Sequence, residues 1–591
     1  MLRSYRRTLL AVAGLSTFAL AGCPNDYTCY DYLNCPPDAG PDAQSDVVRD
    51  AHGDTSQTHH DGGTDGTKDG HVAEGGGPTE TGLPDVIVTS DGPKDAPVDT
   101  FTCTPSADPS SEPCVINEMF GVFVAPVASG GSDTTGSGTR AAPYATISHA
   151  LVSLGTLTRV YACAGTYAEA VTVNAAVDGV QVYGGLVCPG SDGGSGAWSY
   201  GSGFASVVPA TRGFALDVES LVKGALFEDI GFTSMAGDPT VPGASSIAVM
   251  VNASTGVSFT RVHATAGAGV AGTSGVAVPA VAGGTGTNWC PTAGQGGLGS
   301  TNNGGAGGGQ CTCAVAMVGA TQESSTGGPG GGATLQAGNG SSAPVVANTA
   351  SPVDGKGQAG SSTGPGGACL NGHAGADGTA NLGGIPGSTA ILAGVGLSVQ
   401  QAGNGAPGDP GEGGGGGGGS AMFGGAGGGA GGCGGNGGVG GSGGGGSIAI
   451  SIVASALSMT SVTLSTGSGG AGGSGAAGEA GEVGGAKGAD QGTADGCNGG
   501  NGGAGAGGSG GGGGAGGPSV GIAWTGTTTS LTLDGMTVTG LQSLPIPSAF
   551  TSGGGGALGP GGNAGVAATG GNAGAAGAPG PTGSSNAVVA F

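Results

Sequence analysis

Four segments of the chain share one pattern of apolar residues, and this repeat constrains the fold more than any other feature. They span residues 213–237, 246–267, 447–467 and 519–540. Each starts with a run whose apolar residues fall at every second position, and continues with one apolar pair, a two-residue bend and a second pair. Such alternation is typical of β-strands that bury one face. The recurring bend predicts that the chain turns a corner at the same point in every repeat.

The apolar positions of these repeats are expected to point into one shared core. Coils that stack their inward-facing residues on the next coil form a solenoid, in which each coil contacts its neighbours. In the second run of the last repeat the core positions are Leu531, Leu533, Met536 and Val538. In the four first runs they are Phe214, Leu216 and Val218; Ile247, Val249 and Val251; Ile448, Ile450 and Ile452; and Val520, Ile522 and Trp524.

Long glycine-rich segments separate these coils, over residues 268–445, 468–517 and 541–584. They hold most of the 146 glycines of the 591-residue chain, in which 9% of residues are charged and 4% aromatic. Each segment leaves its coil after the second run, so all are expected to project from the same corner. Because the entropic cost of closing a loop grows only with the logarithm of its length, such insertions leave neighbouring coils able to stack.

Two interpretations of the glycine-rich segments remain open. They are either flexible loops or bundled polyproline-II-like strands, which pack closely only where side chains are absent. In composition they resemble the glycine-rich surface proteins of the PGRS type. Because this chain lacks the helical N-terminal domain of that family, the resemblance implies no function.

The stretch before the first repeat carries three short motifs in order: GSGTRAAPYATI, VYACAGTYAEAVTV and VQVYGG. Over residues 115–190 it resembles the N-terminal part of pectin-lyase-like proteins, and more narrowly an uncharacterised branch found on bacterial surface lipoproteins. The resemblance implies an all-β fold, a right-handed parallel β-helix interrupted by the long glycine-rich loops. This β-helix is expected over residues 101–267, 446–467 and 518–540, with a terminal strand at 585–591.

The N-terminus resembles the leader of a bacterial lipoprotein. A basic stretch with Arg3, Arg6 and Arg7 precedes an apolar run that ends in the sequence LAGC. The resemblance implies that residues 1–22 are a signal peptide and that Cys23 is acylated, which makes the lipid bilayer a partner, because two acyl chains anchor a protein stably. Pro24, where some bacteria read Asp as a retention signal, favours the outer membrane or cell surface. The alternative is an ordinary secretory signal whose Cys23 joins a disulfide.

Residues 23–100 are predicted to form a disordered acidic stalk. They are rich in Asp, Gly, Pro and Thr and nearly lack adjacent apolar residues. Such a composition buries too little apolar surface to offset the entropy of folding.

The cysteine count fits an exported protein. If Cys23 is acylated, twelve of the 13 cysteines remain, an even number for an oxidising compartment. The sequence alone does not settle the connectivity. The local pairs that we expect are Cys29–Cys35, Cys103–Cys114 and Cys163–Cys188.

The charge balance limits the partners. With 13 Lys and Arg against 38 Asp and Glu, the net charge is −25. Nucleic acid is excluded as a partner, because phosphate binding needs clustered basic residues. The function that we expect is non-catalytic: a structural, adhesive or glycan-binding role at the cell envelope, with cell-wall or extracellular glycans as partners and with no cofactor or metal site.

The alternative is a carbohydrate-active enzyme, a polysaccharide lyase or hydrolase, with Asp217 and Glu219 as catalytic residues on the outward face of one strand. A lyase of the family that the chain resembles needs carboxylates that bind calcium and a basic residue that removes a proton. The basic residues Arg212, Lys223 and Arg261 are near in sequence, as is the bend Glu228–Asp229. A hydrolase needs carboxylates that face each other. The expected outward positions of the next coils carry none; they are Ala248, Met250, Ala449, Ser451, Gly521 and Ala523.

Overall fold

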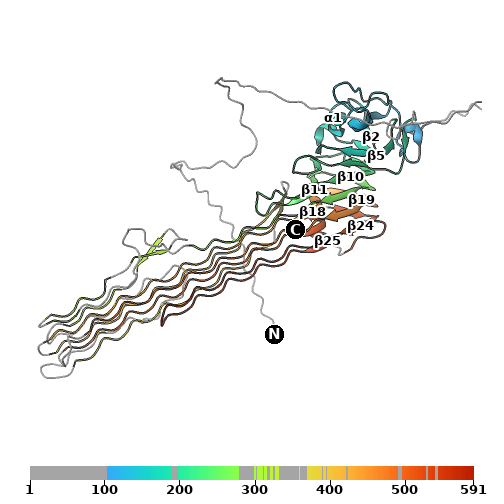
Figure 1. The fold of residues 1–591 in the computed structure, drawn as a ribbon. Coiled ribbons are helices and arrows are strands. Elements are labelled where there is room, and N and C mark those ends of the chain that lie inside the picture. Colours follow the sequence, from blue (N-terminus) through green and yellow to red (C-terminus); the bar gives the residue numbers. More distant parts are fainter. Residues whose placement is uncertain are drawn as a thin grey trace, which may run out of the picture. The chain divides into compact units, whose positions relative to one another are not determined.

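The computed structural model describes residues 103–189, 197–278, 298–300, 303–309, 312–315, 320–323, 326–331, 359, 369–388, 391–393, 396–420, 423–489, 496–526, 530–538 and 543–591. The chain divides into two compact units, Met1–Pro97 and Val98–Phe591, and every described residue belongs to the second. This part is nearly all-β (Figure 1). Its helical elements are α1 (Ile147–Val152) and the short 3₁₀ turns η1 (Pro113–Val115), η2 (Val127–Ser129) and η3 (Ala175–Val177).

Three sheets of mostly parallel strands form the body of this unit. Sheet 1 has the order β1 (Gly121–Val124), β2 (Arg159–Cys163), β5 (Gln181–Val187), β9 (Ala225–Glu228), β12 (Val257–Thr260), β19 (Ala456–Thr460), β22 (Ser530–Leu533) and β23 (Met536–Thr537), and β6 (Ser199–Tyr200) pairs with β5. Sheet 2 has the order β24 (Ala549–Thr551), β20 (Thr463–Thr466), β13 (His263–Ala266), β10 (Ile230–Thr233), β7 (Ala205–Val207) and β3 (Gly165–Tyr167). Sheet 3 has the order β25 (Ser585–Ala590), β21 (Ser519–Thr525), β18 (Ser447–Val453), β11 (Ser246–Asn252), β8 (Leu216–Glu219) and β4 (Val171–Val173).

Each of the first three repeats contributes one strand to each sheet in a fixed order. The second repeat runs through β11, β12 and β13, and the third through β18, β19 and β20. The corresponding strands pair in parallel, so that Val249 lies opposite Ile450 although the glycine-rich segment 268–445 separates them. The strand pairs that the repeat predicts are therefore present.

The predicted bend is a single residue in the left-handed backbone region. Asp229, Arg261 and Ser461 have φ angles of 54°, 51° and 56° and link sheet 1 to sheet 2 in three successive repeats. This conformation is uncommon for residues other than glycine. The N–H groups of Asp229 and Arg261 donate to Thr260 and Thr460 of the next repeat, which stacks the corners on one another.

The predicted direction of some side chains is wrong. Ile247, Ile448 and Val520 do not enter the main core but pack on the opposite face of sheet 3, in an apolar cluster that includes Phe214. The pairing of β11 with β18 is interrupted at Ala248, which points into the core, and strict alternation fails there. The hairpin of β16 (Ile391–Ala393) and β17 (Gly396–Ser398) covers this face with Leu392 and Leu397, so the expected outward positions Met250, Ser451 and Ala523 are buried. Ala449, also expected to point outward, belongs to the main core.

The last repeat also differs from the prediction. Asp534 and Gly535, both with positive φ, form a two-residue turn that folds β23 back onto β22 in antiparallel pairing. Met536 is therefore 50% exposed instead of facing the core. The strand that joins sheet 2 is β24, so this strand lies inside the segment 541–584 that was expected to be glycine-rich loop.

The described glycine-rich segments run side by side as extended chains (Figure 1). Their backbone hydrogen bonds recur every third residue, the period of a polyproline-II helix. Successive residues donate to different neighbours: Gly507 to Asn572, Gly508 to Glu479 and Ser509 to Ala406. Of the two interpretations above, the described residues match the bundled strands.

Two segments occupy the interior of this bundle. Hydrogen bonds connect residues 496–517 with the segments 369–388, 401–419, 424–446, 467–489, 553–569 and 571–583. They connect residues 424–446 with the segments 268–278, 300–309, 326–331, 401–419, 467–489 and 496–517.

Glycine is required inside the bundle because neighbouring backbones approach the Cα atom directly. A Cβ atom on Gly508 would lie 2.0 Å from the carbonyl oxygen of Asn436, and one on Gly505 equally close to that of Cys433. No carbon atom tolerates such a distance from an oxygen to which it is not bonded. The glycines therefore encode close packing of backbones in place of a side-chain core.

Like β16 and β17, the strands β14 (Thr312–Val315) and β15 (Ala320–Glu323) form a separate antiparallel hairpin in the glycine-rich part of the chain.

Candidate functional site

A row of large side chains crosses the outer face of sheet 1. Tyr161 of β2, Tyr183 of β5 and Glu228 of β9 lie opposite one another in register. The two tyrosine rings stack with their centroids 6.1 Å apart, in an apolar cluster that also holds Trp198. The parallel register of the strands thus brings two aromatic residues and a carboxyl group into one line.

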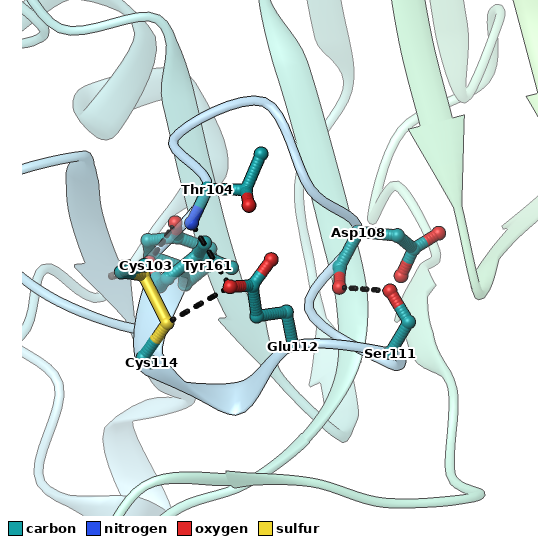
Figure 2. The surroundings of a disulfide bond; sticks show 8 residues. Cys103, Thr104, Asp108, Ser111, Glu112, Cys114 and Tyr161 are labelled. Atoms are coloured by element: carbon teal, nitrogen blue, oxygen red, sulfur yellow. Dashed lines mark hydrogen bonds between the residues drawn. A yellow bond between two sulfur atoms is a disulfide. The ribbon is translucent and has the colours of Figure 1, made fainter. Parts of the chain in front are cut away.

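Residues 103–120, which we call the cap, lie against this row. The Tyr161 hydroxyl donates to the carbonyl of Val115, and Ile116 joins the apolar cluster. Figure 2 shows the disulfide Cys103–Cys114 at the base of the cap, beside Glu112.

A charged cluster adjoins the row at the corner between sheets 1 and 2. The Arg261 guanidinium donates from Nε to Asp229 Oδ1 at 2.8 Å and from Nη2 to Asp229 Oδ2 at 2.9 Å. Nη2 also contacts Glu228 and the Tyr200 hydroxyl, and Tyr200 donates to Asp229. Glu228 is 2% and Asp229 5% exposed, whereas the Arg261 side chain is 39% exposed. The two carboxylates are therefore buried beneath one arginine.

Asp108 of the cap brings a third carboxyl group to this cluster, where its charge acts on Glu228. Burial, and next the negative Asp108, raise the pKa of Glu228 to about 7. Burial opposes ionisation of Asp108, but hydrogen bonds, above all those from Ser110, outweigh it and lower its pKa. Of the two carboxyl groups, Glu228 has the higher pKa and Asp108 the lower.

Glycoside hydrolysis uses one protonated and one ionised carboxyl group that lie about 5 Å or more apart, on either side of the bond that breaks. Here the cap covers the cluster, and Glu228 and Asp229 have almost no contact with solvent. In the described conformation the cluster has a structural role, and a substrate has no access to its carboxyl groups.

The residues predicted as alternative catalytic residues lie elsewhere, on sheet 3. Asp217 stands on β8 in register between Thr172 and Met250, and Glu219 follows on the same face. Burial, and next the charge of Glu219, raise the pKa of Asp217 to about 6. Its Oδ1 atom is buried without a hydrogen-bond partner. This is a suitable environment for a general acid.

The basic residues expected near Asp217 are dispersed. Arg261 belongs to the cluster on the other side of the body, and the backbone of Lys223 is bonded to Asp178. Arg212 exerts its charge on Asp238. Among the described residues, no recorded interaction joins Asp217 to any of these three bases, so the predicted lyase set is not assembled.

The described surface includes two hollows that bear on these residues. One, of about 770 Å³, is lined by Leu151, Leu154, Thr172 and Asn174 beside α1. The other, of about 360 Å³, is lined by residues from sheets 2 and 3 and from the covering hairpin, including Arg212, Phe214 and Leu397. Neither is lined by Asp217, Glu219 or Glu228.

The structure contains three described disulfides. Two are the expected pairs Cys103–Cys114 and Cys163–Cys188, and the third, Cys369–Cys497, joins two segments of the bundle. Cys23, Cys29 and Cys35 lie outside the described residues. In the described part, Cys103, Glu112 and Cys114 are close enough for a metal site. The two cysteines form a disulfide with each other, so neither offers a thiolate to a metal ion (Figure 2).

Comparison of the chain with protein-family models, with curated proteins and with solved structures gave no significant match. In the part of the chain that the structure describes, no helix has the length and apolar character needed to cross a membrane.

Proposed function

We propose that the body is a right-handed parallel β-helix that carries the glycine-rich bundle as a rigid extension. Three observations support this fold: the repeats visit sheets 3, 1 and 2 in one order, the strands pair in parallel, and left-handed corners recur at Asp229, Arg261 and Ser461. The glycine-rich segments leave after the strand in sheet 2 and return at the strand in sheet 3.

The function that we propose is structural: the protein presents an extended, nearly uncharged surface at the cell envelope, where it contacts glycans or other cells. The observation that carries this proposal is the bundle, in which segments 424–446 and 496–517 each bond to neighbours on all sides. A bundle held by backbone hydrogen bonds needs few side-chain contacts for its stability. Its surface is therefore available for contact while its interior stays rigid. The leader resemblance adds export and anchoring through acylated Cys23, with residues 23–100 as the spacer.

A polysaccharide lyase or hydrolase is the second candidate, and the environment of Asp217 is the observation in its favour. The raised pKa of that carboxyl group suits a general acid. The dispersed bases weigh against it, as does the absence of Asp217 from the lining of the two hollows described above. Fold resemblance alone does not transfer activity.

The test uses a soluble form that begins at Val98, incubated with a panel of envelope and plant polysaccharides with and without calcium. The structural proposal expects intact polymers by mass spectrometry, and retention of one or more of them in co-sedimentation. Release of oligosaccharides that stops in Asp217→Ala would overturn it in favour of the enzyme. A result with neither binding nor turnover would restrict the role of the protein to the bundle itself.

A further inference from the structure

Sheets 1, 2 and 3 end in β1, β3 and β4, and these edge strands differ in how their free sides are covered. β1 is bonded by the chain that follows it, because Phe123 donates to Gly138 and accepts from Tyr144. β3 lies against Pro126, whose ring would be 2.7 Å from a Cβ atom on Gly165. β4 contains neither a charged residue nor a proline, which commonly protect an exposed edge, and among the described residues β8 is its one strand partner.

The free side of β4 presents backbone groups that are ready to pair. Val171 donates its N–H group to Ala215 at the start of β8. Because alternate residues of a parallel strand bond to opposite sides, the N–H and C=O groups of Thr172 point away from β8. The carbonyl of Ala170, on the same side as these groups, accepts from the Ser148 hydroxyl of α1 at 3.2 Å. Thr172 is exposed, and in the described part of the chain its backbone has no recorded bond on this side.

This side of β4 opens into the hollow of about 770 Å³ beside α1. Thr172 and Asn174 line it from β4, and Leu151, Leu154 and Val177 contribute apolar side chains. With a rise of 3.3 Å, a strand spacing of 4.8 Å and a sheet spacing of 10 Å, one residue of a strand occupies about 160 Å³. The hollow therefore has room for about five residues of an extended chain.

The lining of the hollow favours an uncharged occupant. Its one charged residue is Asp178, whose carboxylate already accepts the backbone N–H groups of Val222, Lys223 and Gly224. The other lining residues are apolar side chains, hydroxyls, glycine and one amide, and none is aromatic. A charged ligand would find no free countercharge there, and a flat ring would find no ring on which to stack.

We propose that the free side of β4 is a docking site for an uncharged, extended polypeptide segment, which adds to sheet 3 as a further strand. Strand addition supplies affinity through backbone hydrogen bonds and selectivity through pockets for side chains. The docked segment continues an interface that is already present, because β11, β18 and β21 of sheet 3 are themselves uncharged strands paired in parallel. This inference is independent of the structural or glycan-binding role proposed above.

The test is titration of the whole chain with a fluorescently labelled peptide of sequence SNAVVA, blocked at both ends. This is the sequence of β25, an uncharged strand that sheet 3 already contains. Fluorescence anisotropy should show saturable binding of one peptide per chain with a dissociation constant below about 1 mM. Absence of saturable binding in this range would overturn the proposal.

Two N-methylated peptides show whether the peptide pairs as a strand. One carries methyl groups on the amides of the odd positions and the other on those of the even positions. A docked strand bonds to β4 through one of its sides, so one of these peptides should bind at least tenfold more weakly than the other. Equal affinity of the two peptides would contradict strand addition.

Thr172→Pro locates the site on β4. Proline removes the N–H group that faces the hollow, whereas Val171 and Val173 keep their pairing with β8, and proline is tolerated at such an edge position. Thr172→Val, which keeps the N–H group, is the matched control. We expect at least tenfold weaker binding in Thr172→Pro than in Thr172→Val, with equal amide protection in β8 and β11. Equal binding by the two variants would overturn the proposal, and if protection in β8 falls in Thr172→Pro, the methylated peptides decide.

Discussion

Arg261 and Asp229 occupy the same corner in consecutive repeats, and the side chain of the later residue reaches back to hold the earlier one. Both have left-handed backbone, and two hydrogen bonds of 2.8 and 2.9 Å join the guanidinium to the carboxylate. An ion pair between equivalent positions acts along the stacking direction. It therefore secures the packing of one repeat on the next at a point where the backbone itself is unfavourable.

Replacing Arg261 with Ala is expected to destabilise the body strongly. It leaves Glu228 and Asp229 buried without a positive partner, a change that costs about 3–5 kcal/mol in fully buried pairs. Because the arginine side chain is 39% exposed, we expect about 2–3 kcal/mol after allowing for solvent screening. Chemical denaturation measures the change. Lys223→Ala, an exposed surface position, should alter the free energy of unfolding by less than about 0.5 kcal/mol, and equal effects of the two would contradict the assignment.

Adding one methyl group inside the bundle is expected to disrupt it. In Gly508→Ala the new carbon would meet the carbonyl oxygen of Asn436 at 2.0 Å, so the segment must shift. Overpacking of this kind costs about 1–3 kcal/mol. Ala477→Ser, on the exposed ridge of segment 467–489, is the control and should be neutral. The measurement is amide protection in segments 467–489 and 496–517; unchanged protection in Gly508→Ala would show that the close packing is not present.

The sequence alone predicts the strands and their pairing but not the covering of the body. The period-two pattern identifies β11, β18 and β21, because burial of one face imposes it. It does not reveal that Ile247 and Met250 are covered by Leu392 and Leu397, since the hairpin that covers them lies far along the chain within glycine-rich sequence. The Asp534–Gly535 turn carried a usable signal, because Asp-Gly between apolar strands favours a two-residue hairpin.

The charged cluster was only partly accessible to sequence reasoning. Glu228, Asp229 and Arg261 stand at the repeated bend and can be selected from the pattern. Asp108 and Tyr200 belong to segments outside the repeats, so nothing in their spacing links them to the bend. Likewise, the pairing of Cys369 with Cys497 follows from the bundle, whose order no local pattern shows.

Deleting residues 268–445 should weaken the glycine-rich bundle and leave the sheets of the body folded. β11 pairs directly with β18, so a short linker leaves the sheets intact. The deletion removes segment 424–446, which bonds to 467–489 and 496–517, and the remaining bundle loses partners on one side. The deletion also removes Leu392 and Leu397, which cover β11 and β18, so sheet 1 reports on the body. We expect unchanged protection in β12 and β19 and at least a tenfold loss in 496–517. Loss of the sheets together with the bundle would show that the insertion is part of the body.

Removing the Cys369–Cys497 disulfide should cost more stability than removing Cys103–Cys114. The bonds span 128 and 11 residues. In the chain-entropy model the longer loop contributes about 4–5 kcal/mol and the shorter about 3 kcal/mol. Double Cys→Ser variants compared by thermal unfolding measure the difference. A larger effect of the shorter bond would mean that its contacts within the cap outweigh the entropy of the unfolded chain.

The half-buried Asp217 should make stability depend on pH in the acid range. Its pKa rises from 3.8 to about 6 on folding, so between these values the folded chain binds more protons than the unfolded chain. The contribution is present below pH 3.8 and is lost as the pH rises through 6. Two pKa units correspond to about 3 kcal/mol, which partial exposure reduces to about 1–2 kcal/mol. Asp217→Asn should reduce the slope of denaturation curves measured from pH 4 to pH 7 and leave the part that comes from Glu228, whose pKa is also raised on folding. Asp238→Asn should keep the full slope, because the pKa of Asp238 is lowered and its contribution has the opposite sign. A slope in Asp217→Asn that equals the wild-type slope would contradict the contribution of Asp217.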